Sequence, residues 1–169
     1  MIIIKYIFLF IILAISTLIG KFVSRKYVYR LDELEEMQSA LNIFKTKIRY
    51  TYEPLPEIFN EISNNSNKNI SNIFKTAKEK MKQMPAGIAW EEAVDDNICN
   101  LKKEDIIIIK KLSKLLGQTD VEGQISQIEL TEKLLEKQVK DAQDEKQKNE
   151  KMYLKLGTVI GIAIAIILA

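Results

Sequence analysis

The sequence predicts an all-α protein: a cytosolic helical bundle whose long stalk helices run into two terminal transmembrane segments. Three observations lead to this prediction. Both ends of the 169-residue chain are apolar, the middle is rich in charge, and the apolar residues of the middle recur with the period of an α-helix. The predicted parts are a membrane anchor over 1–20, a cytosolic bundle over 21–150 and a second anchor over 151–169.

The first anchor reads MIIIKYIFLFIILAISTLIG. At a rise of 1.5 Å per residue it forms about 30 Å of helix, the thickness of the hydrocarbon core of a bilayer. It reaches this length only if the Lys5 side chain snorkels toward one end. A cleaved signal peptide is the alternative, but its charge polarity would be the opposite, and no A-x-A-like cleavage site occurs near Gly20.

The second anchor is shorter. Residues 156–169 supply about 21 Å of apolar helix. Met152, Tyr153 and Leu154 can extend it if the flanking lysines snorkel. A helix lying in the membrane interface is the alternative, but the segment has no polar face after Lys155, which favours a span.

Basic residues follow the first anchor and precede the second. They are Lys21, Arg25, Lys26 and Arg30, and Lys146, Lys148, Lys151 and Lys155. Because cytoplasmic flanks carry the excess of Lys and Arg, we expect two spans, the central domain in the cytosol and both termini outside.

Composition argues against several classes of function. The net charge is +2, with 25 basic and 23 acidic residues, which does not suit a nucleic-acid binder. The chain has no histidine, so the commonest general base and metal ligand is missing, and its six glycines form no phosphate-binding loop. Its one cysteine, Cys99, suits a reducing cytosol. We therefore predict no catalytic residue, no metal site and no cofactor.

The first cytosolic helix is predicted over Tyr27–Tyr50. Its buried stripe consists of Leu31, Leu34, Leu41, Phe44 and Ile48. No proline or glycine except Gly20 separates it from the first anchor, so one helix can continue from membrane to cytosol. Pro54 and Pro56 end it and occupy the first turn of the next helix. The residues predicted to be buried in that helix are Leu55, Ile58, Phe59 and Ile62.

Two shorter helices are predicted next. Ser63–Asn69, reading SNNSNKN, is expected to be a polar loop, and a helix then runs from Ile70 to about Met84. Its predicted buried residues are Ile73, Phe74, Ala77 and Met81. The run Pro85-Ala86-Gly87 breaks it, and Ile88 to about Cys99 forms a short helix. That helix carries Trp90, Ala93 and Val94, and Trp90 is expected to be core.

The last cytosolic helices meet at a glycine turn. Lys103–Leu116 is predicted to be helical, because Ile106–Ile109 as a lone strand would have no partner. Gly117 suits the C-terminal cap, and Asp120 suits the N-cap of a very long helix. The stripe predicted for the long helix is Val121, Ile125, Ile128, Leu135, Val139 and Ala142. Beyond it, QDEKQKNEK is expected to be a solvated stalk.

Small residues recur every four positions in the second anchor, at Gly157, Gly161 and Ala165. Such spacing lets helix backbones approach closely in lipid. Ser16 and Gly20 offer a weaker version in the first anchor. The alternative is that glycine is merely common in membrane helices.

Several landmarks occur together in a particular order and spacing. They are Pro54-Leu55-Pro56, the stretch 87–93, the turn 116–120 followed by Gln124, and Lys151-Met152-Tyr153 leading into Gly157 and Gly161. Over nearly the whole chain, these landmarks resemble the stage III sporulation protein AB family.

That family in turn resembles the cytoplasmic domains of the inner-membrane platform protein of type II secretion and type IV pilus machines. Those domains carry a glycine before a short helix and a second glycine turn before a long helix, which Gly87 and Gly117 match here. This sequence departs from them at Gln118-Thr119-Asp120, where the platform family has a glutamate turn with another glycine. It also has one such domain only.

The resemblance implies a non-enzymatic membrane platform component of the sporulation channel between mother cell and forespore, with its central domain in the mother-cell cytosol. Implied partners are the secretion-type sporulation ATPase, other membrane proteins of the same channel complex, and membrane lipid. The alternatives are a passive structural scaffold at a septal membrane and a membrane-bound hydrolase using carboxylates such as Glu91, Glu92, Asp95 and Asp96. Candidate structural or interface residues are Pro54, Gly87, Trp90, Gly117, Asp120, Gly157 and Gly161.

Overall fold

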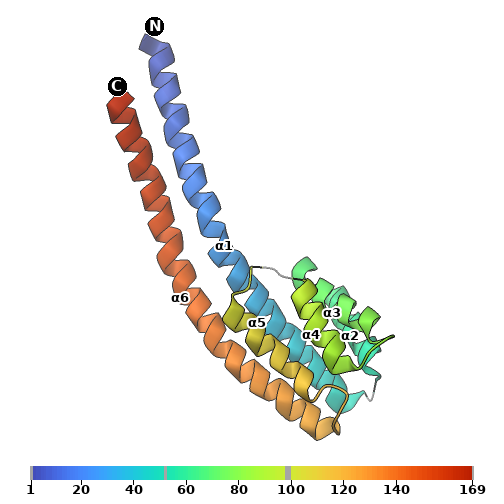
Figure 1. Cartoon of the computed structure of the whole chain (residues 1–169). Coiled ribbons are helices and arrows are strands. Elements are labelled where there is room, and N and C mark those ends of the chain that lie inside the picture. Colours follow the sequence, from blue (N-terminus) through green and yellow to red (C-terminus); the bar gives the residue numbers. More distant parts are fainter. Residues whose placement is uncertain (1, 52, 98–99, 169) are drawn as a thin grey trace. The chain divides into compact units, whose positions relative to one another are not determined.

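The computed structural model describes residues 2–51, 53–97 and 100–168, without the side chains of 2–6, 165 and 168. Cys99 and the side chains of Lys5 and Ala165 therefore lie outside the described residues. Every regular element in the described ranges is helical, so the all-α prediction is confirmed (Figure 1). The elements are α1 (Ile2–Tyr50), α2 (Leu55–Asn65), α3 (Lys68–Lys80), α4 (Ala86–Asp96), α5 (Lys103–Lys110), the 3₁₀ helix η1 (Lys111–Lys114) and α6 (Val121–Leu168).

The chain forms two compact units, one of Arg30–Asp141 and one of Met1–Tyr29 with Ala142–Ala169. The helices α1 and α6 each contribute to both. The uninterrupted course of α1 confirms the prediction of a single long N-terminal helix. The boundaries of the predicted anchors, at residues 20 and 151, stay predictions.

The core of the unit Arg30–Asp141 is built around one face of α1. All five predicted stripe residues of this helix are buried, and Met37 and Ala40 join them. A chain of rings connects four helices: the Phe44 centroid lies 5.2 Å from that of Phe59, which lies 5.1 Å from Phe74 and 5.6 Å from Trp90. These edge-to-face contacts add about 0.5–1.5 kcal/mol per pair to the free energy that the buried area supplies.

The polar segment predicted to be a loop is largely helical. Only Ser66 and Asn67 lie outside helices there, since α2 extends to Asn65 and α3 begins at Lys68. The Asn67 side chain caps α3 by accepting a hydrogen bond from the Ile70 amide at 3.2 Å. A run of Ser and Asn supplies helix caps as readily as loops, so composition alone gave the wrong boundary.

Other boundaries differ by a few residues. The helix α3 ends at Lys80, and Met81 forms its half-buried C-cap. The helix α4 starts at Ala86 with Pro85 as N-cap, so the predicted break forms the start of this helix. The predicted helix 103–116 divides into α5 and η1.

Besides Met81, three predicted core residues are less buried than expected. Leu55 and Val139 are half-buried, and Val121 is 36% exposed. Leu55 and Val121 are the first residues of α2 and α6, where few neighbouring turns are available to cover a side chain. The rest of the α6 stripe is buried.

In the unit Met1–Tyr29 with Ala142–Ala169, the ends of α1 and α6 run antiparallel and side by side (Figure 1). Among the described residues, one helix, Ile7–Tyr50, is long and apolar enough to cross a membrane. Only 11% of the 18-residue apolar stretch of this helix is buried, whereas the core helix of a soluble protein is mostly buried. The rings of Tyr27 and Tyr153 stack with centroids 6.1 Å apart.

Candidate functional site

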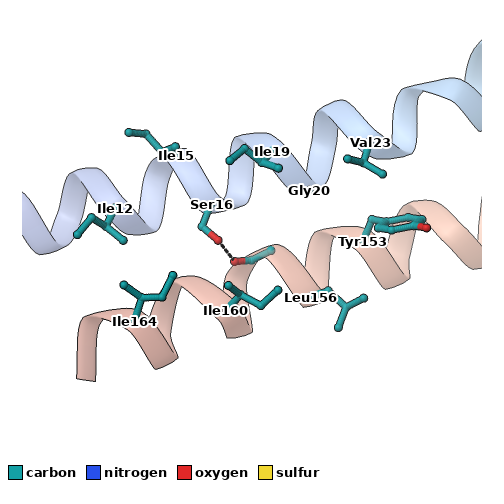
Figure 2. Close-up of a pocket in the computed structure, with 11 residues that line it drawn as sticks. Ile12, Ile15, Ser16, Ile19, Gly20, Val23, Tyr153, Leu156, Ile160 and Ile164 are labelled. Carbon is teal, nitrogen blue, oxygen red and sulfur yellow. Dashed lines mark hydrogen bonds between the residues drawn. The ribbon is translucent and has the colours of Figure 1, made fainter. Parts of the chain in front are cut away.

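Small residues bring α1 and α6 into close contact. The Ser16 hydroxyl donates a hydrogen bond to the Gly157 carbonyl at 2.6 Å, 141 positions along the chain (Figure 2). A Cβ atom on Gly157 would lie 2.7 Å from the Ser16 carbonyl oxygen, and one on Gly20 would overlap the Tyr153 carbonyl oxygen. The two backbones approach at a distance that only glycine permits at these positions.

The next glycine of the stripe is less crowded. A Cβ on Gly161 would lie 2.9 Å from Leu13 Cδ1 and 3.1 Å from Ser16 Cβ, both side-chain atoms. Gly157 and Gly161 therefore face α1 of the same chain, where Ser16 and Gly20 lie opposite them. Specific packing of these glycines inside a membrane stays a prediction.

A second candidate site is the place where three sequence landmarks meet in the bundle. Gly117 has a φ of 70°. A Cβ there would lie 3.2 Å from the Ala86 Cβ and 3.5 Å from Leu55 Cδ1. The turn before α6 thus lies against the start of α4 and the start of α2. We call Leu55, Ala86, Gly87, Gly117 and Gln118, together with the exposed neighbour Ile88, the turn cluster.

Hydrogen bonds fix the conformation of this turn. The Gly117 amide donates to Gln124 Oε1 at 3.3 Å, and Gln124 Nε2 donates to the Thr119 carbonyl at 3.2 Å. The Gly123 amide donates to Asp120 Oδ1 at 3.0 Å, which makes Asp120 the N-cap of α6.

Other members of the turn cluster also lie where close packing is required. A Cβ on Gly87 would lie 2.5 Å from the Ser113 carbonyl oxygen, so α4 and η1 pack backbone to backbone. Pro54 is the exposed N-cap of α2. Ile88, beside Gly87, is 52% exposed and gives this end of the bundle an apolar surface.

Trp90 lies in the core, as expected. Its side chain is fully buried, and its indole Nε1 donates to the Ile109 carbonyl at 2.9 Å. The ring contacts Phe59 and Phe74. It is therefore not available as a surface contact in this structure.

Sequence reasoning missed two buried polar groups on α1. Arg30 Nε lies 2.8 Å from Asp105 Oδ2, and its Nη2 lies 2.9 Å from Oδ1. Glu33 accepts hydrogen bonds from Asn69 Nδ2 at 2.6 Å and from the Asn100 amide at 2.9 Å. Helical phase could have indicated their burial. Arg30 lies one turn before the buried Leu34, and Glu33 lies one turn before the buried Met37, so each shares a helix face with a buried residue.

The carboxylates considered for a hydrolase lie on α4 and have partners. Lys80 Nζ lies 2.6 Å from Glu92 and 2.8 Å from Asp96, and Lys110 pairs with Asp95. Hydrogen bonds to Asp96 and Glu92 raise the pKa of Lys80. Glu91 accepts a hydrogen bond from the Ser113 hydroxyl. Such pairs are typical of a solvated surface.

Comparison with known proteins gives a consistent result. A family model described as stage III sporulation protein AB matches residues 5–169. The stage III sporulation protein AB of Bacillus subtilis (strain 168) is 26% identical over 163 residues, which cover 94% of this chain and 95% of the relative. A solved structure of a stage III sporulation protein AB has a TM-score of 0.64 at 24% identity, covering 70% of this chain and 96% of that chain.

The solved structure supports the helical fold independently of the sequence match. The family model extends through the bundle and both apolar ends, and the curated relative aligns over almost its entire length. The chain therefore belongs to the stage III sporulation protein AB family.

Proposed function

We propose that this protein is a non-enzymatic membrane platform component of the sporulation channel between mother cell and forespore, similar to the inner-membrane platform of a secretion system. Family membership supports the role in sporulation. The observation that favours a membrane platform is the pairing of α1 with α6 through Ser16, Gly20 and Gly157.

That pairing supports a second span. Apolar side chains gain little by associating with each other in lipid, so transmembrane helices pair through small residues and interhelical hydrogen bonds. Both features occur between α1 and α6 here. Because Gly157 lies against Ser16, the apolar end of α6 would occupy the same membrane depth as the apolar end of α1. The central unit would then lie in the mother-cell cytosol with both termini outside.

The turn cluster is the proposed contact for a cytosolic partner. It combines an exposed isoleucine, Ile88, with turn residues whose conformations are fixed by Gly117 and Asp120. The partner we propose is the secretion-type sporulation ATPase, and the other membrane proteins of the channel complex would contact the spans. Both assignments come from the resemblance to secretion platforms.

Reporter fusions test the topology. Alkaline phosphatase, which is active only outside the cytosol, should be active when fused after residue 169 and inactive when fused after residue 147. An inactive C-terminal fusion that is stably produced would leave one span and contradict the platform as proposed.

Co-purification tests the partner. The full chain should retain the ATPase in a nucleotide-dependent manner, and Ile88→Ser should weaken that retention. Ile107→Ser is the matched control, since Ile107 is 59% exposed on α5 and is not part of the turn cluster. Retention that ignores nucleotide and both substitutions would favour the passive scaffold instead.

A further inference from the structure

We propose that the paired ends of α1 and α6 bind one anionic diacyl phospholipid of the cytosolic leaflet, for which phosphatidylglycerol has the required charge and two acyl chains. Its two acyl chains would lie in two adjoining apolar hollows, and its phosphate would contact Lys21 and Arg25. This inference rests on the proposed insertion of both helices in the membrane.

The first hollow lies between the two helices and has a volume of about 440 Å³ (Figure 2). Isoleucine and valine side chains of α1 line one side, and leucine and isoleucine side chains of α6 line the other. Among them are Ile12, Ile15, Ile19 and Val23, with Leu156 and Ile160 opposite. The hydroxyl of Ser16, which also lines it, already donates to the Gly157 carbonyl, so the hollow suits a hydrocarbon chain.

The second hollow adjoins the first on α1. It has a volume of about 370 Å³ and is lined by Ile15, Leu18, Ile19 and Phe22, ending at two basic residues. Ile15 and Ile19 line both hollows and so form the wall between them. Two adjoining apolar hollows that share Ile15 and Ile19 match the two chains of a single diacyl lipid.

The length of the first hollow favours a lipid over a partner's helix. From Ile12 to Val23, α1 rises by about 17 Å. Half of a bilayer's hydrocarbon core is about 15 Å. The hollow therefore fits a chain confined to one leaflet, whereas a transmembrane helix of a partner needs a groove through both.

Charge at the end of the second hollow selects an anionic headgroup. Lys21 and Arg25 are exposed, lie one helical turn apart, and form no ion pair with any residue that the structure describes. Lys26, in contrast, lies 5.0 Å from the centre of the Tyr27 ring. Arginine and lysine bind phosphate oxygens through charge-assisted hydrogen bonds, and basic clusters beside a cytosolic membrane face attract anionic lipid.

The test uses the full chain in detergent, exposed to equal amounts of phosphatidylglycerol and phosphatidylcholine and analysed by native mass spectrometry. We expect one phosphatidylglycerol to be retained in preference to phosphatidylcholine. Lys21→Gln with Arg25→Gln should weaken its retention about tenfold to thirtyfold, given the attraction of two cations for an anionic lipid. Equal retention of the two lipids by the wild-type chain would overturn the proposal.

Two matched variants separate a site from general attraction. Lys26→Gln with Lys151→Gln removes the same charge from residues that line neither hollow, and should leave retention unchanged. Ile19→Trp fills the shared wall and should reduce retention with all cations in place, whereas Ile7→Trp, at a residue that lines neither hollow, should not. Equal losses in the test and control variants would also overturn the proposal. A two-span topology without lipid preference would overturn this inference alone, and a one-span topology would overturn the proposed function.

Discussion

Arg30 on α1 holds both carboxylate oxygens of Asp105 on α5, in a pair of which neither side chain is more than 4% exposed. Asp105 also accepts from the Lys102 amide at 2.8 Å, so the same carboxylate caps its own helix. Gln138 Oε1 accepts from Arg30 at 3.3 Å. One guanidinium thus connects three helices through the interior of the bundle.

Removing the arginine should destabilise the bundle strongly. In Arg30→Met the Asp105 carboxylate stays buried without its counter-ion, which typically costs about 3–5 kcal/mol of unfolding free energy. Urea unfolding of residues 27–148, followed by circular dichroism, measures this. Adding Asp105→Asn, which keeps an acceptor for the Lys102 amide, should restore most of the loss. A single variant as stable as wild type would contradict the buried ion pair.

Residues 27–148 should fold without the apolar ends, because the bundle residues pack on each other. Circular dichroism of the segment should be strongly helical, and it should be a monomer or a weak oligomer by sedimentation. A spectrum dominated by strand would contradict the fold of the isolated segment.

Trp90 should contribute to stability through both its ring and its indole nitrogen. We expect Trp90→Ala to cost about 3–5 kcal/mol. Trp90→Phe keeps a ring among Phe59 and Phe74 but removes the indole donor to the Ile109 carbonyl. That carbonyl still accepts a backbone N–H at the end of α5, so about 0.5–1.5 kcal/mol is expected. Urea unfolding would rank the two. If stability were unchanged while binding of the ATPase was lost, Trp90 would be an interface residue instead.

Substitution of Gly117 should lower the stability of the protein because of its backbone conformation. An alanine at φ 70° meets the steric penalty of the left-handed region, about 1–2 kcal/mol, and its Cβ would press on Ala86. Gly117→Asn is the control, since asparagine tolerates this region better, and it should be less destabilised. Asp120→Ala, which removes the cap of α6, should cost about 1 kcal/mol. An alanine variant with wild-type stability would argue against the turn geometry.

Substitution of Gly157 and of Gly161 should disturb the pairing of α1 with α6 to different extents. Gly157→Ala places a Cβ 2.7 Å from a backbone oxygen of Ser16, whereas the atom nearest to a Cβ on Gly161 is the end of the Leu13 side chain, which can move. We therefore expect Gly157→Ala to disturb the pairing more, and Gly161→Leu to be needed for a comparable effect. Crosslinking between cysteines at 12 and 160 in membranes would report the pairing.

The glycine variants should still insert into the membrane, because each substitution adds apolar surface. Their co-purification with channel partners and the formation of spores should fail. Ala163→Leu, at an exposed position of the same helix segment, is the control and should behave as wild type. Normal spores from Gly157→Leu at normal protein levels would mean that these glycines reflect only the usual composition of membrane helices.

Helical periodicity predicts most of this fold correctly. The stripe of α1, the Gly117 turn and the Asp120 cap follow from the spacing of apolar residues and from turn chemistry. Periodicity does not predict the places where polar residues cap helices or are buried. The segment of Ser and Asn before Ile70 contains a cap and helix ends, which composition does not distinguish from a loop.

Helical phase places Arg30 and Glu33 near the buried stripe of α1, but it does not identify the partners that make their burial possible. Arg30, Glu33 and Asp105 have the residue types of a solvated helix face, and only their partners from distant segments allow burial. The packing of Gly157 on Ser16 could be expected in kind, from small-residue spacing, but the partner helix could not be named before the fold was known.

The hydrogen bond between Ser16 and Gly157 also bears on the order in which the protein is made. At about 5–20 residues per second, a ribosome needs roughly 7–28 s to translate the 141 positions between them. The bundle has the same property, since Lys45 pairs with Glu132, 87 positions later. The N-terminal helix must therefore wait, without its final partner, until the last helix is synthesised. In nascent chains stalled before Gly157, the face of α1 that packs on α6 would lack its partner. Protection of that helix face during translation is therefore part of the protein's folding.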